Sequence, residues 1–198
     1  MMESLFNLED GYKIRVLEED SFIKLQKPLR EMVFEDDHSV FPFEFISDDE
    51  KKKVEALRER IFNDPLKLYL GLFDSDENFV GWSFGFQENA MVYYMCNSAV
   101  LKEHRRKGLY TSLMKTSIDI LEKEGFQVIY SRHNATNNSV IIPKLKAGFV
   151  ISSLEMDDVF GVLVHLKYFT NETRRKIMDY RAGQVRPDEQ LKKLFKMD

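Results

Sequence analysis

The stretch Ser98–Thr111, which reads SAVLKEHRRKGLYT, decides the fold of this chain of 198 residues. It joins a strand-like segment to a long helical segment through a short basic turn. At such a junction the first backbone N–H groups of the helix have no partner within the helix, and the helix dipole adds positive potential. Gly108 permits a close approach of the backbone, and Arg105–Lys107 adds mobile positive charge. The stretch therefore predicts a pyrophosphate site, although a solvated basic turn that happens to contain a glycine has the same pattern.

The sequence before this stretch predicts strands and two helices. A capping box at Ser47–Glu50 begins a second helix that ends near Pro65, and an acidic, then aromatic, loop at 36–46 precedes it. Pro28 is expected to kink or split the first helix. Apolar residues at helical spacing place that first helix at 18–33, and alternating apolar residues place strands at 12–17, 66–73, 79–86 and 91–100.

The sequence after the stretch returns to the helical period and then alternates again. A wide apolar arc over 107–124 is typical of a helix that lies on a sheet, and Gly125 is placed to end it. We expect a strand at 126–131, a short helix that ends near 148, a hairpin of 149–154 with 160–169, and short charged helices at 172–180 and 187–196. The organisation is one α/β domain over 12–170, with an N-terminal extension at 1–11 and a C-terminal helical appendage at 171–198.

Composition excludes several classes of function. With 29 basic and 33 acidic residues the net charge is −4, which argues against nucleic acid as a partner. A single cysteine, Cys96, excludes an intrachain disulfide, and four scattered histidines predict no metal site. The N-terminus lacks the pattern of a signal peptide, and no apolar run is long enough to span a bilayer. We expect a cytoplasmic protein that contacts no membrane.

Two motifs and the order of elements resemble the GNAT superfamily of acyl-CoA-dependent N-acetyltransferases. The family signature Gln/Arg-x-x-Gly-x-Gly/Ala corresponds to residues 105–110, where Arg105 and Gly108 match and Tyr110 replaces the last small residue. The family also has an asparagine eleven residues before a Gly-Phe pair, and Asn137 stands in that relation to Gly148-Phe149. The resemblance covers about residues 12–169 and implies a mixed central sheet of about seven strands flanked by helices.

The resemblance implies that acetyl-CoA is the co-substrate and lies between the strands at 91–100 and 126–131. Its pantetheine arm would pair with the backbone of Ser98, Ala99 and Val100, and Asn137 would bond near the pantetheine or the thioester. The residues implied to hold the pyrophosphate are Arg105, Arg106, Lys107, Gly108, Leu109, Tyr110 and Thr111.

Chemistry in this family is direct attack of a neutral amine on the thioester, and two catalytic positions depart from the usual residues. Many members place a tyrosine four residues before the Gly of Gly-Phe as the acid that protonates the thiolate; here that position is Lys144. A contact with the phosphates of CoA, or a surface position at a helix end, are the other interpretations of Lys144. The frequent position of the general base falls near Tyr94, and Glu88 or a chain of waters are alternatives, because a tyrosine is a poor base at its usual pKa.

The resemblance places Asp36, Phe41 and Phe43 on the acceptor side, where carboxylates and rings suit an ammonium ion. A solvated acidic loop is the competing interpretation. Tyr93 joins the acceptor set, since Tyr93 and Tyr94 point to opposite faces of a strand and one of them reaches the cleft.

The function expected is N-acetylation of a primary amine on a small molecule or an exposed amino group. The alternative is a sensor that binds acyl-CoA with little turnover. The apolar residues of the appendage predict docking on the domain or on a second subunit, so a homodimer is possible.

Overall fold

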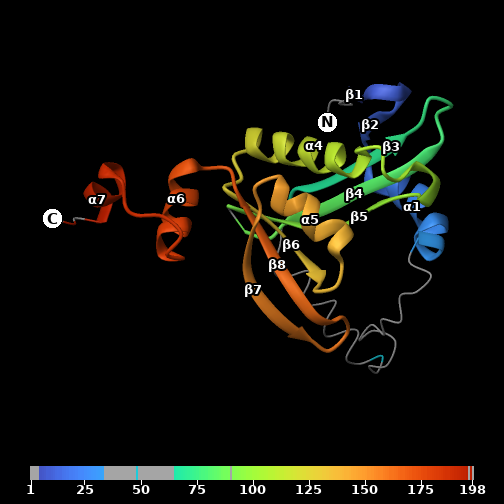
Figure 1. The fold of residues 1–198 in the computed structure, drawn as a ribbon. Helices are drawn as coiled ribbons and strands as arrows, with labels where there is room; N and C mark the ends of the chain where they lie inside the picture. The colour runs from blue at the N-terminus through green and yellow to red at the C-terminus, as the bar shows by residue number, and fades with distance from the viewer. Residues whose placement is uncertain (1–4, 34–47, 49–64, 90, 196, 198) are drawn as a thin grey trace.

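The computed structural model of the chain describes residues 5–33, 48, 65–89, 91–195 and 197 (Figure 1). Its described strands form one mixed sheet of eight strands in the order β1-β2-β3-β4-β5-β6-β8-β7, in which only β5 and β6 pair in parallel. The α/β fold is confirmed. The strands are β1 (Leu5–Asn7), β2 (Lys13–Val16), β3 (Lys67–Phe73), β4 (Phe79–Gln87), β5 (Val92–Val100), β6 (Val128–Asn134), β7 (Val150–Asp157) and β8 (Gly161–Phe169).

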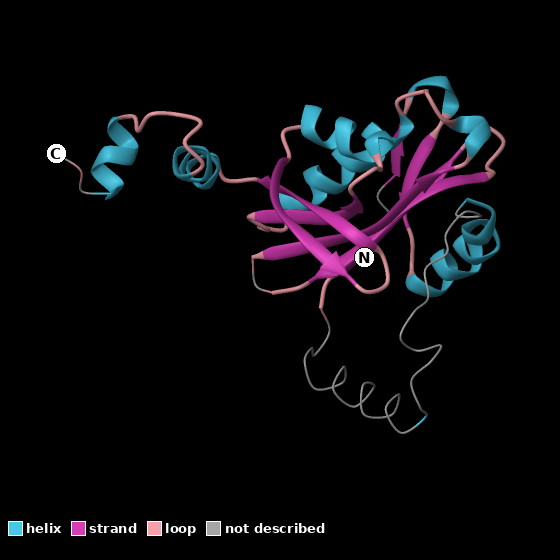
Figure 2. Cartoon of the chain, turned by 60° about the horizontal axis from the view of Figure 1, so that its bottom comes forward, coloured by secondary structure: helices cyan, strands magenta, loops and turns pink. Residues whose placement is uncertain are grey.

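The described helices cover both faces of this sheet (Figure 2). Buried residues of α4 pack with alternate residues of β3 and β5 in the main core, which includes Leu70, Tyr93 and Leu113. On the other face, Phe22 of α1 packs against Trp82 in a second, smaller core. The helices are α1 (Glu19–Val33), α4 (Leu109–Lys123), α5 (Asn138–Lys146), α6 (Glu172–Arg181) and α7 (Glu189–Phe195).

The expected elements are present with small shifts where the structure describes them. Residues 5–7, expected in the N-terminal extension, pair with β2 and give the sheet eight strands instead of about seven. Pro28 lies inside α1, which is continuous from Glu19 to Val33 and is not split. The expected loop at 36–46 and the body of the second helix lie outside the described residues.

The sheet opens between β5 and β6. Only Val92–Tyr94 pairs with Val128–Tyr130, and both strands run on beyond these pairs. On its other edge β5 carries a bulge at Cys96, where the register with β4 shifts between Phe84 and Gly85. Position 85 needs a glycine, because a Cβ there would lie 2.1 Å from the carbonyl oxygen of Tyr94. The parallel pair therefore forms a wedge that widens after Tyr94 and Tyr130.

The C-terminal helices project away from the sheet beyond β8 (Figure 1). Arg175 of α6 donates to the carbonyl oxygen of Gly148 at 2.6 Å, and Arg174 donates to Gln127 Oε1 at 2.8 Å. Leu191 of α7 is buried, and Tyr180 and Phe195 lie ring to ring at 5.6 Å. The appendage thus docks through α6, and α7 packs on α6. Among the described helices, none is long and apolar enough to cross a membrane.

Candidate functional site

A cavity of about 500 Å³ lies at the end of β5, bounded by the turn before α4 and by one side of α5. Ten of the eleven residues predicted to hold acetyl-CoA line it, and the exception is Lys107. The lining residues are Val33, Ser98, Ala99, Val100, His104, Arg105, Arg106, Gly108, Leu109, Tyr110, Thr111, Asn137, Ser139, Val140 and Pro143. Residues that are far apart in the sequence therefore meet around one cavity.

The turn that begins α4 presents backbone donors to this cavity. Gly108 is the N-cap of α4 in the left-handed conformation, with φ 75°. A Cβ at Gly108 would meet nothing within 4 Å, so this conformation, and not lack of space, is what favours glycine there. The N–H groups of Leu109, Tyr110 and Thr111 occupy the first three helical positions, which have no acceptor within the helix. This is the arrangement that binds phosphate at helix N-termini.

The basic side chains of the turn differ in direction: some line the cavity, and one contacts the segment before β2. Arg105 lines the cavity, and its Nε donates to the carbonyl oxygen of Val100 at 2.8 Å, which ties the turn to the end of β5. Lys107 points elsewhere: its Nζ donates to the hydroxyl of Tyr12 at 2.9 Å. The positive φ of Arg106, 65°, precedes this change of direction. Lys107 therefore braces the turn against the segment before β2, and it does not line the cavity.

Asn137 lies at the N-terminus of α5, on the opposite wall of the cavity from the α4 turn. It is the N-cap of α5, and its Oδ1 accepts from the Ser139 hydroxyl at 2.7 Å instead of capping a backbone N–H. Val140 and Pro143 continue the same wall. The asparagine is thus placed where the resemblance implies a contact with the pantetheine arm.

Lys144 is one of the largest fully buried side chains in the described structure, with 1 % of the residue exposed. Its Nζ donates to Ser131 Oγ at 2.8 Å and lies 3.6 Å from Met95 Sδ. Met95 and Ser131 directly follow the last paired residues of β5 and β6, so the amine lies at the point of the wedge. The interpretation of Lys144 as a surface lysine is wrong, because α5 turns this residue onto its buried face together with Ile141.

The surroundings of Lys144 favour its neutral form. Burial lowers the pKa of Lys144 to about 7, and no described carboxylate forms an ion pair with it. The ring of Phe149 lies 4.6 Å from Nζ and supplies the nearest π-face. Lys144 therefore titrates near neutral pH, where an ordinary surface lysine stays protonated.

Two residues of β6 extend the polar contacts of Lys144. Ser131 is fully buried, and its Oγ lies 2.9 Å from His133 Nε2. Burial, and to a lesser extent the charge of Lys144, lowers the pKa of His133 to about 3. Ser131 is not among the residues predicted from the sequence; its position two residues before His133, on the same face of a strand, was the available signal.

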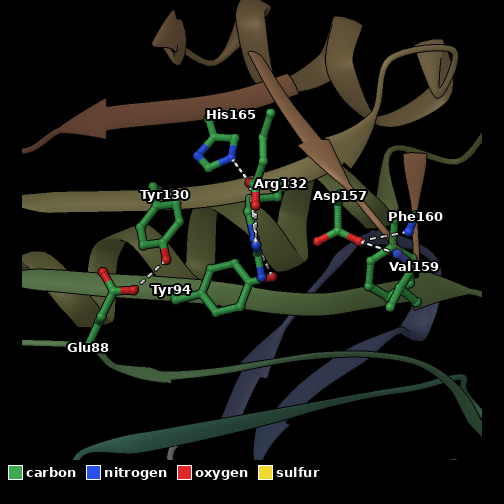
Figure 3. Close-up of polar contacts among 9 residues, drawn as sticks. Glu88, Tyr94, Tyr130, Arg132, Asp157, Val159, Phe160 and His165 are labelled. Atoms are coloured by element: carbon green, nitrogen blue, oxygen red, sulfur yellow. Dashed lines mark hydrogen bonds and ion pairs between the residues drawn. The ribbon is translucent and has the colours of Figure 1, made fainter. Parts of the chain in front are cut away.

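A second polar cluster lies on the opposite face of the sheet (Figure 3). Arg132 Nε donates to the hydroxyl of Tyr94 at 3.4 Å, and Arg132 Nη1 pairs with Glu155 at 3.2 Å. Glu155 also contacts His165 on the intervening strand β8. This cluster connects β5, β6, β8 and β7 beside the wedge.

Tyr94 itself is half-buried, and burial raises the pKa of its hydroxyl despite the hydrogen bond from Arg132. Its ring stacks on that of Tyr130, whose hydroxyl donates to Glu88 at 2.6 Å (Figure 3). A raised pKa makes Tyr94 a poor base but leaves it able to pass a proton through water.

Of the residues predicted to bind the acceptor, the structure describes only Tyr93. Tyr93 is 2 % exposed and lies in the main core with its ring against Phe126, so it is a packing residue and leaves the acceptor set. Asp36, Phe41 and Phe43 lie outside the described residues. Within the described part of the chain, no group of three or more potential ligands could hold a metal ion.

Comparison with known proteins identifies a family and a fold. Residues 30–149 match the model of the acetyltransferase (GNAT) family. No curated protein matches the chain in sequence.

Three solved structures show how far the fold likeness extends. Ribosomal-protein-S5-alanine acetyltransferase from Vibrio fischeri is 11 % identical, with a TM-score of 0.63 over 86 % of this chain and 98 % of that one. Spermidine N-acetyltransferase from Vibrio cholerae is 14 % identical, with a TM-score of 0.58 over 84 % and 98 %. The yncA structure from Salmonella typhimurium, determined with its cofactor acetyl-CoA, is 14 % identical, with a TM-score of 0.58 over 90 % and 98 %.

Proposed function

This chain belongs to the acetyltransferase (GNAT) family, whose members use acetyl-CoA, and we propose that it transfers the acetyl group to a primary amine by direct attack on the thioester. The observation that carries the proposal is the cavity at the end of β5, between the N-terminus of α4 and α5. When bound, acetyl-CoA supplies the electrophilic thioester carbon.

The residues of the cavity fit this co-substrate. The backbone of Ser98–Val100 pairs with β4 on one edge, and among the described strands it pairs with none on the edge that faces β6. The Val100 carbonyl accepts from Arg105, and the other open backbone groups of this edge need hydrogen-bond partners that the amides of a pantetheine arm would supply. The free N–H groups of the α4 turn, with Arg105 and Arg106 beside them, would hold the pyrophosphate.

Lys144 would protonate the departing thiolate. Its place at the point of the wedge, away from the basic turn, supports this role over a contact with the phosphates of CoA. A pKa of about 7 is close to the value at which a general acid works best at neutral pH. Lys144 thus replaces the tyrosine that many members of the family have at this position.

The amine would approach from the face that carries Tyr94, opposite α4 and α5. The Tyr94 hydroxyl would take the amine's proton through water, and the raised pKa of Tyr94 argues against direct removal. Two carboxylates lie along this face: Glu155 reaches Tyr94 through Arg132, and Glu88 reaches it through the stacked Tyr130.

The acceptor is expected to be a small molecule or an exposed amino group. Two structural neighbours act, by their names, on an alanine of a ribosomal protein and on spermidine. The charge of Arg132 beside Tyr94 is paired with Glu155, and Glu88 lies along the same face, so these side chains do not discriminate a single amine from a polyamine.

A binding protein with little turnover is the second candidate, and the burial of Lys144 favours it. With 1 % exposed, Lys144 must gain contact with the thiolate for catalysis. Two measurements separate the two functions: release of CoA thiol with a panel of monoamines, diamines and peptides, and acetyl-CoA affinity by calorimetry. Thiol release with any one of these amines supports the transferase. Tight binding of acetyl-CoA without thiol release above the buffer rate supports the sensor.

A further inference from the structure

A buried general acid needs a route by which its proton is replaced, and we propose that Ser131 and His133 form that route to Lys144. The inference rests on the proposed role of Lys144 and extends it to two residues that otherwise have no part in the reaction. They are relay residues and touch neither the acceptor nor acetyl-CoA.

The geometry forms a continuous chain of hydrogen bonds. Lys144 Nζ lies 2.8 Å from Ser131 Oγ, and that oxygen lies 2.9 Å from His133 Nε2. The first two residues are fully buried, and His133 is half-buried. The chain therefore leads from the point of the wedge to a ring that water can reach.

The three groups have the chemistry that a relay requires. A hydroxyl both donates and accepts, so Ser131 can accept from the ammonium form of Lys144 and donate to its amine form. Neutral imidazole carries a donor on one nitrogen and an acceptor on the other, so His133 can pass a proton without becoming charged. The low pKa of His133 is consistent with this, since the buried ring stays neutral.

The proposed relay returns a proton to Lys144 after each transfer to the thiolate. An N–H bond of the Lys144 ammonium breaks as the S–H bond of CoA forms, which leaves a neutral amine. Ser131 then gives its O–H proton to Nζ as His133 gives its Nε2 proton to Ser131 and a proton from solvent binds Nδ1, so the ring stays neutral. Exchange with solvent or rotation of the ring restores the Nε2 proton. The net change is one proton moved from solvent to the thiolate.

The polar cluster of Tyr94, Arg132 and Glu155, on the other face of the sheet, could not relay a proton. There Tyr94 and Glu155 are joined by Arg132, whose guanidinium does not release a proton in proteins. Hydrogen bonds through an arginine hold the neighbouring side chains in position but pass no proton between them. The serine–histidine chain has no such interruption.

The test compares kcat in four variants with an amine that the wild type acetylates. Ser131→Ala and His133→Ala should each lower kcat by about tenfold or more and leave the KM for acetyl-CoA unchanged. Ser131→Thr keeps the hydroxyl and should retain most of kcat. Free imidazole should restore kcat to His133→Ala in a concentration-dependent way, with no effect on the wild type or on Lys144→Met.

The outcomes separate this inference from the proposed function. If Lys144→Met loses kcat while Ser131→Ala and His133→Ala keep it, Lys144 regains its proton directly through the cavity and the relay is wrong. If the His133→Ala protein is folded and slow but imidazole never restores it, His133 is only structural and the relay is again wrong. If Lys144→Met keeps full kcat, the role proposed for Lys144 fails first. Thermal unfolding of each variant checks that a loss of rate is not a loss of fold.

Discussion

The rings of Tyr94 and Tyr130 stack with their centroids 4.9 Å apart, at the last residue pair that joins β5 to β6. The stack lies on one face of the sheet, and Lys144 lies on the other, just beyond the same pair. The wedge therefore has a polar group on each side of its point. A thioester held in the wedge would have Tyr94 on the side open to an acceptor and Lys144 on the side of α5.

Replacing Gly108 with valine should abolish measurable binding of acetyl-CoA in a folded protein. The residue has φ 75°, which a β-branched side chain resists, so the turn and its N–H groups must move. Calorimetric titration measures the affinity. Gly183→Val is a matched control, because Gly183 has φ 73° in the appendage, far along the chain from the cavity. Undiminished affinity in Gly108→Val would show that this turn does not hold the pyrophosphate.

Truncation after Thr170 should lower stability and expose apolar surface. It removes Arg174 and Arg175, whose hydrogen bonds tie α6 to Gln127 and to Gly148. Losing both should cost about 2–4 kcal/mol and lower Tm by roughly 5–15 °C. Truncation after Gly183, which removes only α7, should cost less. Calorimetry and light scattering measure Tm and oligomeric state; no change in Tm, solubility or assembly would show that the appendage is a solvated extension.

The sequence predicted the order of strands and helices because each carries its own apolar period. It also predicted the turn before α4, since a glycine and three basic residues at a strand-to-helix junction are local features. It missed β1, a strand at the edge of the sheet whose three residues are too few to show an alternating pattern. Short edge strands are stabilised by pairing, which no local pattern records.

The burial of Lys144 depended on the packing of α5. Its spacing of three residues from Ile141 would have placed it on the buried face, but a lysine on that face is rarely expected. The choice between Tyr93 and Tyr94 could not be made locally either. The alternation of side chains along a strand shows that the two rings point to opposite faces of the sheet. Because both faces are covered, it does not show which ring reaches the site.

Tyr94→Phe should lower kcat and shift one limb of the pH–rate profile. The substitution keeps the ring and its stack on Tyr130 but removes the hydroxyl that accepts from Arg132. If the hydroxyl passes the amine's proton to water, kcat should fall by roughly tenfold to a hundredfold. Tyr93→Phe is the control, since Tyr93 lies in the main core, on the opposite face of β5 from Tyr94. An unchanged rate and pH profile in Tyr94→Phe would remove this hydroxyl from the proton path.

Lys144→Met should make the protein more stable and less active at the same time. The wild type buries an amine whose pKa falls from 10.5 to about 7, so at neutral pH and below it carries the cost of a buried charge. Methionine fills a similar volume without that cost and should raise the free energy of unfolding by roughly 1–4 kcal/mol near pH 6. Loss of the acid should lower kcat by about 10²–10⁴ while acetyl-CoA still binds.

The gain in stability of Lys144→Met should depend on pH. Between pH 7 and 10.5 the unfolded wild type holds a proton on Lys144 that the folded state does not, so the wild type gains stability as pH rises. The gain is at most about 1.4 kcal/mol per pH unit, and Lys144→Met lacks it. Urea unfolding of both proteins at pH 6 and pH 9 should therefore show the advantage of the variant shrinking at the higher pH. An advantage that is constant, or that grows with pH, would mean that Lys144 remains charged in the folded protein, and its assignment as a neutral-pH acid would be wrong.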